Sequence, residues 1–282
     1  MAGEVLSKSN PSIERGAPAI SVRDLRVKYG DHEILHGINF DAPAGQTLVI
    51  LGGSGSGKST LLRTLVGLEQ PSSGSIWIRG KDFASMRESE RDELRKKMGM
   101  SFQSGALFGS MTVAENVALP LREHTELDNS TIDIMVRMKL NQVGLSGFEN
   151  YMPAQLSGGM KKRAAIARAL AMDPEVLFFD EPSAGLDPII AAGIDDLIIA
   201  LKKAFHITIL VVTHELSSAF LIADRMILLI KGNIVADGTP EEFRASVQPR
   251  VRQFLDRVSE KELTAEIDYL QMLTGEIPPE RQ

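Results

Sequence analysis

The chain has 282 residues, 43% of them hydrophobic and 24% charged, which is ordinary for a globular protein of one or two domains with a sizeable buried core. Its formal net charge of -6 gives no overall attraction for nucleic acid, because nucleic acids are held mainly by clustered Lys and Arg. The chain contains no cysteine, which excludes disulfides, thiolate zinc sites and thiol redox chemistry.

Neither a membrane span nor a secretory signal is predicted. The most apolar stretch, residues 219–230, is interrupted by Asp224 and Arg225 and falls short of the roughly 18 to 20 residues needed to cross a bilayer. Residues 1–18 are mixed polar and lack the apolar centre of a signal peptide. We therefore expect residues 1–18 to form a disordered lead.

The order of strand and helix patterns predicts an α/β core. Two segments alternate between apolar and polar residues as half-buried strands do: residues 20–29 and 34–41. Three short continuous apolar runs are typical of parallel strands covered on both faces: residues 47–51, 176–179 and 207–212. Helical patterns lie between them: residues 59–66, 189–205 and 215–222. This alternation indicates a sheet with helices on both faces.

Strand-like runs vanish between residues 98 and 171, which predicts an inserted helical subdomain at about residues 104–170. Its helical patterns cover three segments: residues 113–121, 132–143 and 158–171. The insertion belongs to one domain, residues 19–246, and the chain shows no internal repeat.

Residues 247–282 form a charged, amphipathic C-terminal extension. Apolar residues recur on one helical face at positions 251, 254, 255 and 258, and again at positions 263, 267 and 270. Residues 259–262 fit an S-x-x-E capping box before the second stripe. Short amphipathic helices are marginal alone and must pack on something. We hypothesise that the second helix docks between subunits; packing against its own domain is nearly as well supported.

A phosphate loop is predicted at residues 52–59. The pattern G-x-x-x-x-G-K-[ST] is fitted by Gly52, Gly53, Ser54, Gly55, Ser56, Gly57, Lys58 and Ser59, and Thr60 follows in the first helical turn. The loop follows an apolar strand and opens a helix, so backbone N–H groups and the positive end of the helix dipole can face an anion. Lys58 can then reach the β- and γ-phosphates of a nucleotide, and Ser59 can ligate Mg²⁺.

Two carboxylates follow the apolar strand at residues 176–179. Asp180 stands where an acid beside a phosphate loop holds Mg²⁺, directly or through water. Glu181 can poise an attacking water as general base. Alone, this pair is equally well explained as solvated loop carboxylates, and the phosphate loop upstream favours the catalytic interpretation.

A second anion site is indicated at residues 156–160, which we name the signature segment. Ser157, Gly158 and Gly159 precede a basic helix, and a serine followed by two glycines at a helix N-terminus offers a hydroxyl and backbone donors. A plain N-cap with a flexible turn is the alternative. Its position shortly before Asp180 supports the functional interpretation.

From about residue 20 to 240 these motifs resemble the ATPase subunits of ABC transporters. The resemblance implies a P-loop NTPase core with an antiparallel β-subdomain and an inserted helical subdomain, with ATP and Mg²⁺ as cofactors. It also implies roles for four further residues. Gln103 senses Mg²⁺ and the γ-phosphate, His214 contacts the γ-phosphate, Asp187 lies in the D-loop, and Tyr29 stacks on adenine.

One departure from this family is that Met160 ends the signature segment where most members carry glutamine. The segments at residues 102–108, 116–125 and 156–163 resemble the ATPases of MCE-type (Mla) lipid transport systems. That resemblance implies phospholipid cargo and a peripheral position on the cytoplasmic face of the bacterial inner membrane. It implies four partners: a second copy of the chain in a head-to-tail homodimer, a membrane permease subunit, an MCE-domain lipid-binding protein and often a STAS-domain subunit.

Two alternatives remain open at this point. An ABC importer ATPase for amino acids or ions shares every catalytic motif. A soluble ABC ATPase acting on ribosomes or DNA usually carries two ATPase units or a long coiled-coil insertion, and neither is present in the chain. A GTPase would require an [NT]-K-x-D motif, which the chain lacks.

The apolar residues between positions 101 and 111 fit either a groove for a permease helix or local core packing.

Overall fold

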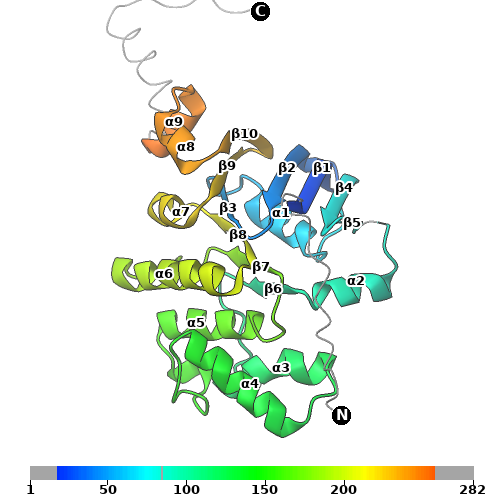
Figure 1. Cartoon of the computed structure of the whole chain (residues 1–282). Helices are drawn as coiled ribbons and strands as arrows, with labels where there is room; N and C mark the ends of the chain where they lie inside the picture. Colours follow the sequence, from blue (N-terminus) through cyan, green and yellow to red (C-terminus); the bar gives the residue numbers. More distant parts are fainter. Residues whose placement is uncertain (1–17, 84, 258–282) are drawn as a thin grey trace, which may run out of the picture.

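The computed structural model describes residues 18–83 and 85–257, which form two β-sheets with helices packed around them (Figure 1). The larger sheet has the strand order β10-β9-β3-β8-β7-β6. Its strands are β3 (Thr47–Leu51), β6 (Met98–Ser101), β7 (Val176–Asp180), β8 (Thr208–Thr213), β9 (Arg225–Ile230) and β10 (Asn233–Gly238). Five of these strands are parallel, and β10 pairs antiparallel with β9 at the edge.

The second sheet is antiparallel, with the order β2-β1-β4-β5. Its strands are β1 (Pro18–Tyr29), β2 (His32–Pro43), β4 (Ser73–Ile78) and β5 (Lys81–Asp82). One face of this sheet packs with one face of the larger sheet in a shared hydrophobic cluster. The helix Lys58–Leu65 contributes to the same cluster, so the antiparallel sheet and this helix together cover one face of the larger sheet.

The helices lie on both faces of the larger sheet and in a separate layer next to it (Figure 1). They are α1 (Lys58–Leu65), α2 (Glu88–Arg95), α3 (Val113–His124), α4 (Asn129–Gln142), η1 (Pro153–Gln155), α5 (Gly158–Ala169), α6 (Pro188–Phe205), α7 (Leu216–Ile222), α8 (Pro240–Ala245) and α9 (Pro249–Leu255). Helices α3, α4 and α5 contact one another and form the helical layer.

Strand periodicity explains why the central strands are apolar throughout. In β7, Leu177 and Phe179 belong to the cluster on the helical side, while Val176 and Phe178 belong to the cluster shared with the antiparallel sheet. Successive side chains of a strand point to opposite faces, so a strand covered on both faces needs apolar residues at every position. All four of these side chains are almost completely buried.

The expectation that strand-like runs vanish after residue 98 is wrong for its first four residues. Met98–Ser101 is β6, the edge strand that pairs with β7. A Cβ on Gly99 would lie 2.3 Å from the backbone oxygen of Ala169, so the strand fits only because this residue is glycine. A four-residue segment with a central glycine has little strand propensity of its own, and the pairing with β7 decides its conformation.

Other strands were also missed by pattern analysis. The apolar stretch at residues 219–230 divides into the end of α7 and the buried strand β9.

Within the described residues, no helix combines the length and the apolar character that a membrane crossing requires.

The first part of the C-terminal extension packs on the chain's own core. In α9 the side chain of Val251 is fully buried, and Phe254 and Leu255 pack against the cluster on the helical side. The first predicted apolar stripe of the extension therefore packs against its own domain as far as Leu255. Position 258 and the second predicted stripe, residues 263–270, lie outside the described residues.

Candidate functional site

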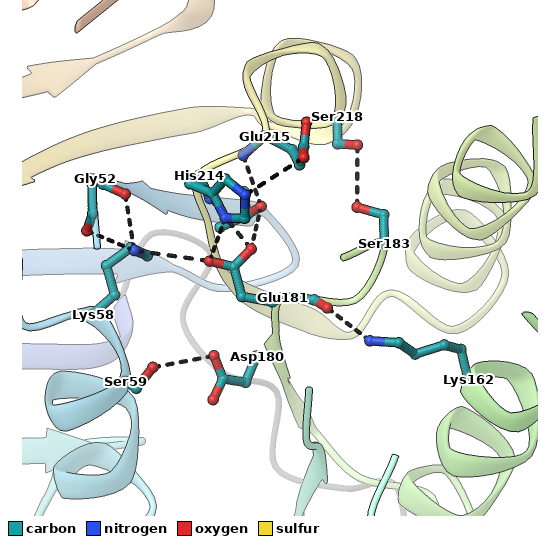
Figure 2. A network of polar contacts seen from close by, with 12 residues as sticks. Gly52, Lys58, Ser59, Lys162, Asp180, Glu181, Ser183, His214, Glu215 and Ser218 are labelled. Atoms are coloured by element: carbon teal, nitrogen blue, oxygen red, sulfur yellow. Dashed lines mark hydrogen bonds and ion pairs between the residues drawn. The ribbon is translucent and has the colours of Figure 1, made fainter. Parts of the chain in front are cut away.

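Three adjacent strands bring the predicted catalytic residues to one edge of the larger sheet (Figure 2). The phosphate loop follows β3, the pair Asp180 and Glu181 ends β7, and His214 follows β8. Parallel strands place their carboxyl ends at the same edge, which is where open α/β sheets bind ligands. The strand order β3-β8-β7 therefore positions the site.

The phosphate loop is shaped by glycines where a side chain would not fit. A Cβ on Gly52 would lie 2.4 Å from the backbone oxygen of Leu229 and 2.5 Å from Ser56 Oγ. Gly57 has a φ of 102°, which L side chains rarely adopt, and as the N-cap of α1 it offers no side-chain acceptor. The first N–H groups of α1 thus have no side-chain cap and suit an anion.

The ammonium of Lys58 lies at the centre of the site. Its Nζ donates to the backbone oxygens of Gly52 at 2.9 Å and Gly53 at 3.1 Å, and it lies 3.8 Å from Glu181 Oε1. Burial lowers the pKa of Lys58, whereas the charges of Glu181 and Asp180 raise it. The cation is therefore held beside the loop whose backbone faces the cavity.

The carboxylate of Glu181 is fixed by the residues that end β8. Its Oε2 accepts from Thr213 Oγ1 at 2.9 Å and from the His214 backbone N–H at 3.3 Å, and its Oε1 lies 2.9 Å from His214 Nδ1 (Figure 2). The side chain is 9% exposed. A buried carboxylate with this fixed geometry can act as a general base toward a water in the cavity.

Asp180 and Ser59 form an oxygen pair that fits Mg²⁺. Ser59 Oγ donates to Asp180 Oδ1 at 3.4 Å. Burial, followed by the neighbouring charge of Glu181, raises the pKa of Asp180. Among the described residues, no group of three or more His, Cys, Asp or Glu side chains could hold a metal. The pair accords with the way proteins hold Mg²⁺, through one or two protein oxygens together with substrate phosphates and water.

A cavity of about 1110 Å³ lies over the phosphate loop. Gln103, Glu181 and His214 all contribute to its wall. Four residues of the C-terminal region also line it, and no sequence motif pointed to them: Arg250, Gln253, Phe254 and Arg257.

Tyr29 lies at the end of β1 and outside the wall of this cavity. Its ring is 48% exposed, and its hydroxyl donates to Glu69. This hydrogen bond raises the pKa of the Tyr29 phenol, while the hydroxyl of Thr60 in the first turn of α1 lowers it. The exposed ring is therefore next to the helix that the phosphate loop opens.

The signature segment lies apart from the phosphate loop. Ser157 caps α5, its Oγ accepting from the Met160 N–H at 3.3 Å, and Asp187 caps α6. A Cβ on Gly159 would lie 2.4 Å from Ile190 Cγ2, so the glycine allows the two helix starts to approach. Ser157, Gly158, Gly159 and Asp187 do not line the cavity over the phosphate loop.

Besides the four cavity residues of the C-terminal region, two residues that support the site were missed by sequence reasoning. Thr213 fixes the Glu181 carboxylate, and buried Lys162 donates to the backbone oxygens of Gln103 and Glu181. Lys162 stands three residues after Gly159 and four before Ile166, on the buried face of α5. That spacing was the available signal, and the sequence analysis assigned no role to Lys162.

These features define a P-loop nucleotide hydrolase. Its helical layer carries the signature segment, the second predicted anion site. The ABC transporter family model matches residues 35–184, so the chain belongs to this family, binds ATP and hydrolyses it. The resemblance found in the sequence and the expected fold class are both confirmed.

Named relatives are similar over most of the chain. The probable ribonucleotide transport ATP-binding protein mkl of Mycobacterium leprae is 44% identical, over 84% of this chain and 69% of its own length. The intermembrane phospholipid transport system ATP-binding protein MlaF of Escherichia coli is 43% identical, over 86% of this chain and 91% of its own length. The dimeric ATP-binding cassette MJ0796, solved with ADP and Pi, is 30% identical with a TM-score of 0.72 and covers 78% of this chain and 98% of that one.

Proposed function

We propose that this chain powers an inner-membrane ABC transporter that moves phospholipids for outer-membrane lipid homeostasis. The observation that carries the cargo assignment is the similarity to MlaF, which extends over nearly the whole length of both proteins. The same site chemistry would serve any cargo, because cargo does not enter the ATPase site. The proposal on cargo therefore rests on relatedness, and the proposal on catalysis rests on the geometry.

Each site residue has a proposed role in ATP hydrolysis. Lys58 and the N–H groups of the phosphate loop bind the β- and γ-phosphates, and the ring of Tyr29 stacks on adenine. Glu181 takes the proton of the attacking water. His214 faces the γ-phosphate and orients the Glu181 carboxylate through the 2.9 Å contact at Nδ1.

Mg²⁺ would be held by Ser59, Asp180 and Gln103. When bound, the ion neutralises developing charge on the phosphate oxygens. A divalent cation bound here would compensate the charges of the adjacent buried carboxylates Asp180 and Glu181.

A head-to-tail homodimer would complete the site. Ser157 and Asp187 are exposed at helix N-termini and do not line the cavity of their own chain. Next to them two adjacent apolar residues are exposed, Ile189 at 83% and Ile190 at 42%, and a partner chain would cover both. We infer that the signature segment of one chain closes on the ATP held by the phosphate loop of the other, as the dimeric state of the related cassette suggests.

A groove of about 880 Å³ is the proposed contact with the permease. Phe102, Ala106 and Phe108 from the Gln103 segment (residues 101–111) line it together with α5 and α3. Phe108 is 51% exposed, whereas Leu107 packs against the core. The apolar residues of this segment therefore divide between a groove wall and local packing. A permease helix in this groove would contact the segment that carries Gln103.

The other proposed partners are an MCE-domain lipid-binding protein and a STAS-domain subunit, in a complex peripheral to the cytoplasmic face of the inner membrane. No nucleic acid partner is proposed, since the chain is acidic overall.

Copurification from membranes in detergent tests this assignment. An MCE-domain protein and a permease are expected to copurify, and the purified complex should move labelled phospholipid between vesicles in an ATP-dependent manner. Ribonucleotide transport is the second candidate, favoured by the name of the mkl relative. ATPase stimulation by ribonucleotides with no lipid transfer would replace the phospholipid proposal, and copurification of an amino-acid or ion permease would replace both.

A further inference from the structure

The side chain of Lys162 joins two loops that the catalytic mechanism uses. It is buried in α5, and its Nζ donates to the backbone oxygen of Gln103 at 2.6 Å. The same Nζ donates to the backbone oxygen of Glu181 at 2.9 Å (Figure 2). Burial lowers the pKa of Lys162, whereas the charges of Glu181 and Asp180 raise it. A buried ammonium is costly unless it is paired and hydrogen-bonded, so its place between these loops needs an explanation.

The backbone of Glu181 is in a conformation that needs external support. Its φ is 47°, in the left-handed region that non-glycine residues rarely adopt. Such residues persist only when their surroundings fix them. The N–H of Glu181 donates to the Val212 oxygen at 2.9 Å, and its oxygen accepts from Lys162 and, at 3.3 Å, from the Ala184 N–H.

A second cation of α5 supports the Gln103 segment in the same way. Arg168 donates to the backbone oxygens of Gly105 at 2.9 Å and Ala106 at 2.8 Å. Both of these residues have positive φ values, 76° and 46°. Helix α5 therefore binds left-handed backbone in two loops through cationic side chains. Buried Lys162 binds the carbonyl oxygen of Glu181, and half-buried Arg168 binds those of Gly105 and Ala106.

We propose that Lys162 is a positioning residue for ATP hydrolysis, because one ammonium holds the backbone of Glu181 and that of Gln103 at a fixed separation. The inference rests on the proposed role of Glu181 as general base. Through Lys162 a displacement of the Gln103 segment reaches the backbone of Glu181, which carries the catalytic carboxylate. Removing the ammonium should therefore slow the chemical step while leaving ATP binding intact, since Lys58 and the phosphate loop are untouched.

The test compares kcat, KM and ATP affinity of the full-length chain carrying Lys162→Met. Methionine has a similar length and no donor, and the hydrogen bond from Ala184 to the Glu181 oxygen remains. We expect kcat to fall about 10- to 100-fold, as for a displaced catalytic group, with ATP affinity unchanged within about twofold. Lys162→Arg keeps several donors and should recover part of kcat. The control is Lys161→Met on the same helix. Among the described residues the side chain of Lys161 makes no hydrogen bond or ion pair, so its variant should behave as wild type.

A kcat of Lys162→Met within about twofold of wild type would overturn the proposal. An equal loss of ATP affinity, or no recovery with Lys162→Arg, would also overturn it, because either result indicates a merely structural role. If Lys162→Met does not fold, Lys162→Gln replaces it, with an intermediate kcat expected and a wild-type kcat counting against the proposal. Glu181→Gln is measured in parallel. If its turnover is normal, the assignment of the base itself fails; if it is slow while Lys162→Met is normal, only the inference on Lys162 fails.

Discussion

The phosphate-loop side and the signature side of the molecule differ in how complete they are. On the first, Lys58, Asp180 and Glu181 are each 7% exposed and contact one another or Ser59 across three strands. On the second, Ser157 and Asp187 are exposed and their side chains only cap helices. The difference suggests that one half of the site is formed within a single chain and the other half acts on a partner.

This contrast has a physical basis. Burying a lysine between two carboxylates requires a fixed backbone, which the parallel sheet provides through its hydrogen-bonded strands. A helix N-terminus needs no such burial, and its donors face solvent until an anion arrives. The four predictions below test whether the two halves have these separate roles, from the largest expected effect to the smallest.

Lys58→Ala should abolish ATP binding and turnover, because the phosphate loop loses its cation. The measurement is nucleotide binding by calorimetry and phosphate release by the purified complex. Arg252→Ala is a suitable control, since Arg252 pairs with Asp256 on α9 and does not line the cavity. Turnover of Lys58→Ala at the wild-type rate would show that the buried half does not bind the phosphates.

Glu181→Gln should retain ATP and slow hydrolysis about 10² to 10⁴-fold, the usual effect of losing a general base. It also removes a negative charge beside Lys58, so the ATP-bound dimer should accumulate in size-exclusion chromatography. Equal turnover together with no gain in dimer would exclude Glu181 as the base.

Ser157→Arg should slow hydrolysis about 10²-fold through misplacement of the partner's nucleotide, while ATP binding to the isolated chain stays intact. Mixing this variant with Lys58→Ala sharpens the test. In a mixed dimer one site combines an intact Lys58 with an intact Ser157, so the mixture should hydrolyse ATP faster than either variant alone. Lost ATP binding in the isolated Ser157→Arg chain would contradict the division into two halves.

Asp180→Asn should raise the Tm of the chain without nucleotide by a few degrees. In a domain of this size, a change of about 1 kcal/mol in the free energy of unfolding moves Tm by about 2–4 °C. The pKa of Asp180 is raised by burial, so its ionised form is less stable in the folded state than in the unfolded one. The destabilisation by ionised Asp180 is absent at pH values below the pKa of Asp180 in the unfolded chain. It grows as the pH rises through the pKa of Asp180 in the folded chain. The Tm difference from wild type should therefore shrink as the pH falls toward 3.8. Asp133→Asn, at an exposed position of α4, should leave Tm unchanged.

Sequence patterns predicted the strands β1, β2, β3, β7 and β8 and the helices α1, α5, α6 and α7 within one or two residues, whereas the predicted bounds of α3 and α4 differ by three residues at one end. The predicted strand at residues 47–51 coincides with β3, and the predicted helix at residues 189–205 starts one residue after α6 does. The strands β4, β5, β6, β9 and β10 were missed. Of these, β5 and β6 are short edge segments that take their conformation from a neighbour rather than from their own residues, and β9 lies in the same apolar stretch as the end of α7.

The sequence by itself determined the chemistry of this protein. The glycines of residues 52–57, Lys58 and the pair Asp180 and Glu181 have a meaning that depends on local order along the chain: strand, loop, helix, and acids at a strand end. Such motifs are legible because their backbone conformation is set by the residues themselves.

Only the tertiary structure decided which distant groups support that chemistry. Lys162 binds Gln103 and Glu181, which are 59 and 19 residues away along the chain. Thr213 donates to Glu181 across 32 residues. Helix α9, still further along the chain, forms part of the cavity wall. The positions of these groups follow from strand order and helix packing, which are set by the burial of whole faces and not by any local pattern. For that reason the contacts of buried Lys162 with the two loops could be identified only once the fold was known.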